Sequence, residues 1–125
     1  MKTGISLFIR IADTVCDKIL SGDYQSEGRI PSVRDLAAEM EVNPNTVMRS
    51  VERLQRYEII YNKRGVGYFV ASDAREKIHK MRLANFLDNG LPSLFREMDL
   101  LGLGISELAE AYKLYKLNSS NSEQS

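Results

Sequence analysis

Apolar residues recur every three or four positions near the start of the chain, and this spacing predicts an amphipathic helix over residues 5–20. The apolar positions are 5, 8, 9, 12, 15, 16, 19 and 20, which fall on one face of a helix. Ser21-Gly22 then favours a helix end. Residues 24–30 carry no helical stripe and contain a glycine, so we expect a connecting loop with room for a short strand.

Two further helices are expected next, each opened by a capping residue. Ser32 follows Pro31 and can cap a helix of about ten residues, with Asp35 near its positive end. Asn43 can cap the following helix, because asparagine is favoured there and proline is tolerated in the first turn. The expected buried faces are Val33, Leu36, Ala37 and Met40, then Val47, Val51 and Leu54. The opposite side of the later helix carries Asn45, Thr46, Arg49, Arg53 and Arg56.

A β-hairpin is expected after these helices. Residues 59–63 and 68–71 are rich in isoleucine, tyrosine, phenylalanine and valine, which favour strands. Gly65 and Gly67 lie between the two runs and can supply the positive φ angles of a tight turn.

The rest of the chain predicts three helical pieces and a polar end. A long helix is expected over Ala74–Asp88, with Asn89-Gly90 as its stop. Two shorter helices are expected over Pro92–Leu101 and Ser106–Leu117. Residues 118–125 are polar, and we expect them to be disordered.

The bulk composition excludes several classes of protein. With 125 residues the chain can form one compact domain, or one small domain and a short appendage. It has no long apolar run and no secretory signal, so we expect a cytoplasmic protein without membrane partners. Cys16 and His79 are the only residues of their kinds, so an intrachain disulfide and the usual zinc ligand sets are excluded. We expect no metal and no cofactor.

The formal net charge of zero hides an uneven distribution of charge. Residues 29–82 carry 11 basic and 7 acidic side chains, whereas residues 83–125 carry 3 basic and 6 acidic ones. A basic middle segment permits a nucleic-acid partner, although a solvated surface can have the same charges by chance.

The order of the expected elements predicts a winged helix-turn-helix: helix, short helix, tight turn, third helix and two-stranded hairpin. The fold class is thus mostly α with a small β-hairpin. We expect a DNA-binding domain over residues 1–72 and a helical dimerisation region over residues 73–117. The candidate DNA-binding residues are Arg34, Asn43, Asn45, Thr46, Arg49, Arg53, Lys63, Arg64, Gly65 and Gly67.

Three stretches of this region also resemble the winged helix of the bacterial GntR family. They are residues 30–37 (IPSVRDLA), 42–49 (VNPNTVMR) and 63–70 (KRGVGYFV), and the similarity runs from Ile19 to Val70. The NPNTV core and the short segment behind the wing are similar to the YtrA subfamily. The resemblance implies repression by a homodimer, in many cases of an adjacent transporter operon. It also implies operator contacts by Arg34, Asn45, Thr46, Arg49, Gly65 and Gly67.

The sequence departs from the broad family pattern at three positions. Pro44 and Met48 stand where many relatives carry arginine, so the residues that read bases differ, and Arg49 can take over contacts of its neighbour. Glu58 stands where glycine is usual before the first wing strand. A residue other than glycine there predicts a strained or altered turn, with a carboxylate that would repel phosphate.

The apolar faces behind the wing predict an interface with a second copy. About 45 residues can scarcely enclose a ligand pocket, so dimerisation is favoured, while a small-molecule effector in a groove at the dimer seam stays open. The alternative is that these faces pack back on their own winged helix. The candidate interface residues are Phe86, Leu87, Leu94, Phe95, Met98, Leu101, Leu108, Tyr112 and Tyr115.

Two other functions compete with operator binding. Winged helices also serve as protein-interaction modules, and a zero net charge is compatible with that role. An enzyme is disfavoured, because Gly65-Val66-Gly67 lacks the third glycine of a dinucleotide fingerprint and the single histidine limits catalytic sets.

Overall fold

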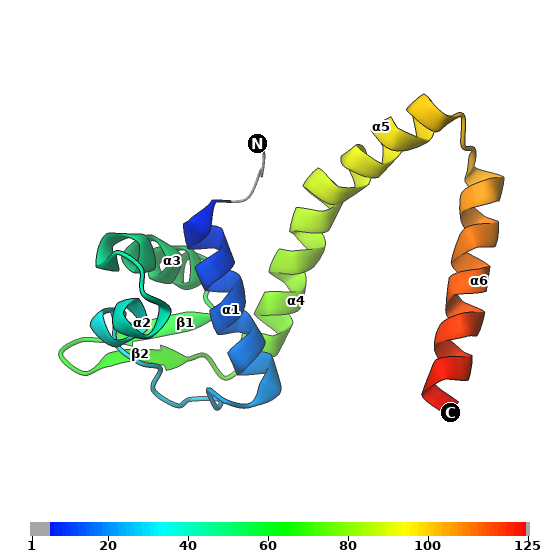
Figure 1. Cartoon of the computed structure of the whole chain (residues 1–125). Helices are drawn as coiled ribbons and strands as arrows, with labels where there is room; N and C mark the ends of the chain where they lie inside the picture. Colours follow the sequence, from blue (N-terminus) through cyan, green and yellow to red (C-terminus); the bar gives the residue numbers. More distant parts are fainter. Residues whose placement is uncertain (1–5, 125) are drawn as a thin grey trace. The chain divides into compact units, whose positions relative to one another are not determined.

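The computed structural model describes residues 6–124 and contains helices and one small antiparallel sheet (Figure 1). This confirms the expected fold class, mostly α with a β-hairpin. The chain divides into two compact units, the first ending at Leu83 and the second beginning at Ala84. The elements in chain order are α1 (Leu7–Ser21), α2 (Val33–Met40), α3 (Pro44–Arg56), β1 (Ile60–Lys63), β2 (Gly67–Val70), α4 (Ala74–Asn85), the π-helical turn η1 (Phe86–Gly90), α5 (Leu91–Leu101) and α6 (Ile105–Gln124).

Local hydrogen bonds set the ends of the first three helices. Gly22 ends α1 with a φ of +92°, a conformation that glycine adopts without strain. The Ser32 side chain accepts a hydrogen bond from the Asp35 N–H at 3.1 Å, and the Asn43 side chain accepts one from the Asn45 N–H at 2.8 Å. Both caps expected from the sequence are confirmed. Ile5, where we expected the first helix to begin, lies outside the described residues.

The core of the first unit joins α1, α2, α3, the hairpin and α4. Its buried members include the expected inner stripe of α3. The hairpin pairs Ile60 with Val70 and Lys63 with Gly67 at its two ends. A single bridge between Arg29 and Phe69 extends the sheet, so the loop before α2 contributes one paired residue rather than a strand.

Helix α4 is part of the same core. Ala74, Ile78 and Met81 are buried together with residues of α1 and α3. The compact unit therefore extends to Leu83, beyond the boundary at residue 72 that the sequence suggested. The reason is that the first two turns of α4 carry their own apolar face onto the winged helix.

Cys16 lies on the inner face of α1 and is fully buried. Burial disfavours the charged thiolate and raises the pKa of Cys16 to about 11. The thiol therefore keeps its proton at neutral pH, as expected of a structural cysteine rather than a redox switch.

The second unit differs from the sequence expectation at two places. Asn89-Gly90 does not end a helix, because Gly90 keeps right-handed helical angles, φ −66° and ψ −48°, and η1 leads directly into α5. Gly102 does end α5, with a φ of +72°. Helix α6 continues to Gln124 and so includes most of the segment for which we expected disorder; residues 105–124 contain no proline or glycine to stop it. None of the described helices is long and apolar enough to cross a membrane.

Candidate nucleic-acid interface

Helix α3 buries one face and exposes the other. Val47, Val51 and Leu54 are buried in the core, which fixes the rotation of the helix about its axis. The opposite side bears Asn45 and Arg49. Thr46 and Arg53 border this side and are half-buried. The polar stripe expected from the sequence thus faces away from the core and is open to a partner.

Two arginines of this stripe lie against aromatic rings. The guanidinium carbon of Arg49 is 4.2 Å from the centre of the Phe8 ring, which comes from the first turn of α1. The corresponding distance from Arg53 to the Tyr57 ring is 5.3 Å. A guanidinium can stack on a ring face while its N–H groups stay free in their own plane. Both arginines can therefore bind an anion while they stay in contact with these rings.

The hairpin places a second group of candidate residues at its tip. Lys63, Arg64 and Gly65 are exposed, and the Lys63 ammonium lies 4.5 Å from the centre of the Phe69 ring. Gly65 has a φ of +79°, with no described heavy atom within 4 Å of the position of a Cβ. The turn therefore needs glycine for its backbone angle and leaves a bare tip that can approach a surface closely.

Gly67 is constrained by a neighbouring side chain as well as by its backbone. Its φ is +143°, and a Cβ built there would lie 2.8 Å from Nε of Arg29. Arg29 is exposed and its side chain lies beside the wing at Gly67, yet it was not among the residues singled out from the sequence. Only its bridge to Phe69 places it there, which a linear motif does not reveal.

Arg34 and Asn43 are the two candidate residues that precede α3 in the chain. Arg34 is exposed in the first turn of α2. Asn43 is exposed too, but its side-chain oxygen already accepts the Asn45 N–H. The side-chain oxygen of Asn43 thus has a structural role, and the NH2 group of the same side chain remains available as a donor.

Basic side chains on α2, α3 and the wing have no acidic partner in the part of the chain that the structure describes. The side chains that do form ion pairs there are Lys18, Lys77, Arg82 and Lys113. Those without one include Arg29, Arg34, Arg49, Arg53, Lys63 and Arg64. Uncompensated cations of this kind attract the phosphates of a nucleic acid.

Two exposed apolar residues lie beside these cations. Met48, on α3, is 38% exposed, and Val66, at the tip of the hairpin, is 51% exposed. Apolar side chains can contact the methyl group of thymine in a groove. The sequence analysis noted Met48 only because many relatives carry arginine there. It did not predict that Met48 is exposed, because exposure depends on how the whole unit packs.

Glu58 occupies the turn between α3 and β1 in the left-handed region, with a φ of +62°. The expected departure from an unstrained turn is thus present, since this region favours glycine. The Glu58 carboxylate lies 3.8 Å from Lys77 on α4. An ion pair within the unit therefore compensates this negative charge in part.

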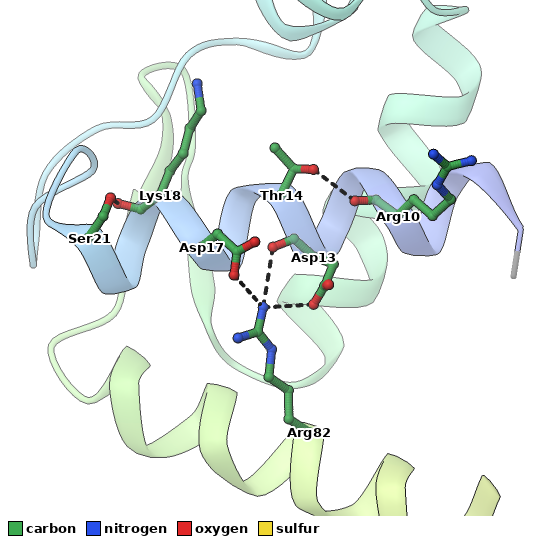
Figure 2. A network of polar contacts seen from close by, with 7 residues as sticks. All are labelled: Arg10, Asp13, Thr14, Asp17, Lys18, Ser21 and Arg82. Atoms are coloured by element: carbon green, nitrogen blue, oxygen red, sulfur yellow. Dashed lines mark hydrogen bonds and ion pairs between the residues drawn. The ribbon is translucent and has the colours of Figure 1, made fainter. Parts of the chain in front are cut away.

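Helix α4 is attached to α1 by an arginine held between two carboxylates (Figure 2). Arg82 reaches Asp13 at 2.7 Å and Asp17 at 2.9 Å, and both aspartates lie on α1. The same nitrogen lies 3.4 Å from the Asp13 carbonyl oxygen. We call Arg82, Asp13 and Asp17 the Arg82 clamp.

The second unit exposes most of the candidate interface residues. Phe86, Leu87, Phe95, Leu101, Tyr112 and Tyr115 are exposed in the single chain, and Leu94 and Leu108 are partly exposed. Met98 is an exception, since it is only 6% exposed and already buried within the chain. The structure adds apolar residues that the sequence did not single out: Leu100, Leu103, Leu114 and Leu117.

Comparisons with known proteins agree with this geometry. Residues 9–70 match the model of the bacterial regulatory proteins of the gntR family. The chain is 28% identical to the HTH-type transcriptional regulator YhcF of Bacillus subtilis, over 87% of this chain and 88% of that protein. It is 25% identical to the HTH-type transcriptional repressor YtrA of the same organism, over 90% of this chain and 85% of that protein.

Solved structures give the same family over nearly the whole chain. A GntR-family transcriptional regulator from Bacteroides thetaiotaomicron is 47% identical, with a TM-score of 0.78, and the match covers 91% of this chain and 99% of the other. A GntR-family regulator from Listeria monocytogenes is 26% identical, with a TM-score of 0.68, over 90% of this chain and 97% of the other. These relatives are transcriptional regulators and not enzymes. The chain therefore belongs to the GntR family, among its YtrA-like members, and is a DNA-binding transcriptional regulator with a winged helix-turn-helix.

Proposed function

We propose that two copies of this chain bind a palindromic operator in the bacterial cytoplasm and repress transcription from it. The observation that carries the proposal is the row of cations along α2, α3 and the wing that have no acidic partner among the described residues. A surface of this kind suits a duplex, whose charged phosphates flank grooves of readable base edges.

Each group of residues has a role that follows from its chemistry. Asn45 and Arg49 lie on the exposed side of α3 and are assigned to base edges in the major groove. Arg34, Arg53 and Lys63 are assigned to phosphates. The tip around Gly65 is narrow and is assigned to the neighbouring groove.

The homodimer is supported by the apolar residues that the second unit leaves exposed. Leu101 is 72% exposed and Tyr115 is 63% exposed in the single chain. Large apolar side chains that stay in contact with water favour association. A two-fold dimer would present two copies of α3 to two half-sites of an inverted repeat.

Repression is supported by the relative YtrA, which is a transcriptional repressor by name. A dimer on an operator that overlaps a promoter would exclude RNA polymerase. The proposal extends to a transporter operon beside the gene of this protein, as the family resemblance implies. Deletion of the gene should then raise the transcript level of that operon, and a lowered level would indicate activation instead.

Selection of bound sequences from a random pool of duplexes tests the proposal directly. We expect an inverted repeat whose half-sites are centred about ten base pairs apart. Affinity for the recovered duplex should fall linearly in a plot against the logarithm of salt concentration. Recovery of no sequence preference, or a salt-insensitive affinity, would favour a protein-interaction module and overturn the proposal.

A further inference from the structure

Phe8 lies in the first turn of α1, yet two consecutive residues of α3 hold it. The Arg49 guanidinium lies over its ring, with its carbon 4.2 Å from the ring centre. The Ser50 hydroxyl, which is buried, donates a hydrogen bond of 2.6 Å to the Phe8 carbonyl oxygen. The backbone and the ring of Phe8 are thus both fixed relative to α3.

We infer that Phe8 is a positioning residue for operator recognition, which orients the Arg49 guanidinium toward the base edges before DNA arrives. This inference rests on the proposed function, because it assigns a role within the same binding surface. It extends that surface to α1, which no part of the operator-binding proposal includes.

A contact with a ring can leave the hydrogen-bond donors of Arg49 free. When a guanidinium lies over a ring, its N–H donors can still point outward within the guanidinium plane. In the described part of the chain Arg49 forms no ion pair that would have to break on binding. The guanidinium is therefore held by the ring and remains available for a bidentate contact to a base.

Holding the side chain in advance should strengthen binding. A free arginine samples many rotamers and loses that freedom when it binds, so an arginine that is already ordered loses less. The Arg49–Phe8 distance is the shortest of the four cation–ring distances among the described residues. It also joins α3 to another helix, whereas Arg53 rests on Tyr57, at the end of its own helix.

A double-mutant cycle on the full chain tests the inference, with the duplex recovered by selection as the probe. Phe8→Leu keeps an apolar side chain but removes the ring. We expect it to weaken binding about three- to tenfold in the Arg49 protein, and to change nothing in an Arg49→Ala background. Phe8→Tyr keeps the ring and should restore the affinity. Equal losses in both backgrounds, or no rescue by Tyr, would show a general packing role and overturn the inference.

A second measurement needs no DNA and separates this inference from the operator proposal. Protons above an aromatic ring are shielded, so the Arg49 side-chain NMR signals should lie upfield in the parent protein and move downfield in Phe8→Leu. Thermal unfolding of the same samples establishes that the variants fold. Unshifted Arg49 signals would remove the stack and overturn the inference, even with operator binding intact. If the Arg49 signals are shifted but the protein shows no sequence-selective DNA binding, the contact is present and the operator proposal has failed. The role assigned to Phe8 in operator recognition then fails as well.

Discussion

Arg34 and Arg49 belong to different helices, and both are exposed without an acidic partner in the described residues. Replacing either by alanine should cost about 1–3 kcal/mol of operator binding and leave the free energy of unfolding nearly unchanged. Fluorescence anisotropy with the selected duplex measures the first quantity and denaturant unfolding the second. Lys116→Ala is the matched control, because it removes an exposed positive charge from α6. Unchanged affinity in both arginine variants would place the recognition surface elsewhere.

Glu58 allows backbone strain to be separated from charge. Glu58→Gly should raise the free energy of unfolding by about 0.5–1 kcal/mol, because glycine adopts a positive φ without the penalty of a Cβ. Glu58→Ala loses the same contact with Lys77 but keeps the penalty, so we expect no gain from it. Urea unfolding of both variants makes the comparison. A gain that is equal in both would assign the effect to the carboxylate instead of the backbone.

At the residue scale, the sequence predicts well what depends on near neighbours. The caps by Ser32 and Asn43 bond to residues two or three positions away, so a short motif contains both partners. Phe8 and Arg49 lie 41 positions apart and meet only after α1 packs on α3. No spacing rule connects such a pair, and the stack was therefore not predicted.

The Arg82 clamp joins the last turn of α4 to α1. Arg82→Met should lower the free energy of unfolding by about 1 kcal/mol, because two partly exposed ion pairs are lost. The loss also leaves the like charges of Asp13 and Asp17, one helical turn apart, without the cation between them. The difference from the parent protein should shrink at high salt. Lys80→Met, which removes an exposed cation two residues earlier in the same helix, is the control. An equal loss there would contradict a specific clamp.

Helix α6 begins with a carboxylate that caps its own N-terminus. Glu107 accepts a hydrogen bond of 3.1 Å from the Gly104 N–H. Bonds from its own N–H and from the Gly104 N–H hold the pKa of Glu107 below its usual value of 4.5. The stabilisation is therefore present above that value and is lost as the pH falls through the lowered one.

Amide exchange in the first turn of α6 should consequently accelerate in acid. Glu107→Gln cannot titrate, so exchange in that variant should lack this pH dependence once corrected for intrinsic rates. Exchange rates for residues 105–108, followed from neutral to acidic pH, check the expectation. The same acid response in both proteins would show that another group titrates.

Among the elements, the expected stop at Asn89-Gly90 was wrong for a physical reason. Glycine ends a helix when it takes a left-handed conformation, as Gly102 does, but it tolerates helical angles equally. A Cβ at residue 90 would lie 2.6 Å from the Phe86 ring, so glycine here makes room for an aromatic side chain one turn back. Composition alone does not distinguish these two uses of glycine.

For the whole molecule, the dimer proposal makes a prediction that keeps the chain at full length. Leu101→Lys with Tyr115→Lys places two charges on the exposed apolar surface of the second unit, and we expect a monomer in sedimentation velocity. Operator affinity should also fall in this variant, since each half-site is then bound by a separate monomer. Lysines at the exposed polar positions Glu97 and Asn118 form the control pair. A double variant that stays dimeric would locate the interface elsewhere.

Point variants are preferable to truncation because the domain boundary lies later than the sequence suggested. A cut after Ser72 would remove Ala74, Ile78 and Met81 from the core. The winged helix itself could be located from the sequence, because the apolar residues of its helices and hairpin follow clear patterns. The boundary between the two units could not be located from the sequence, because it falls within α4. The spacing of apolar residues in an amphipathic helix does not show where the first core ends.

The enclosure of Cys16 has a practical consequence. It is the one cysteine in the sequence, it is fully buried, and it keeps its proton at neutral pH. A cysteine introduced at the exposed position of Arg64 would thus be the single sulfhydryl that a maleimide dye reaches in the folded protein. The wing could in this way carry a fluorophore at one chosen site, with no native cysteine to be removed first.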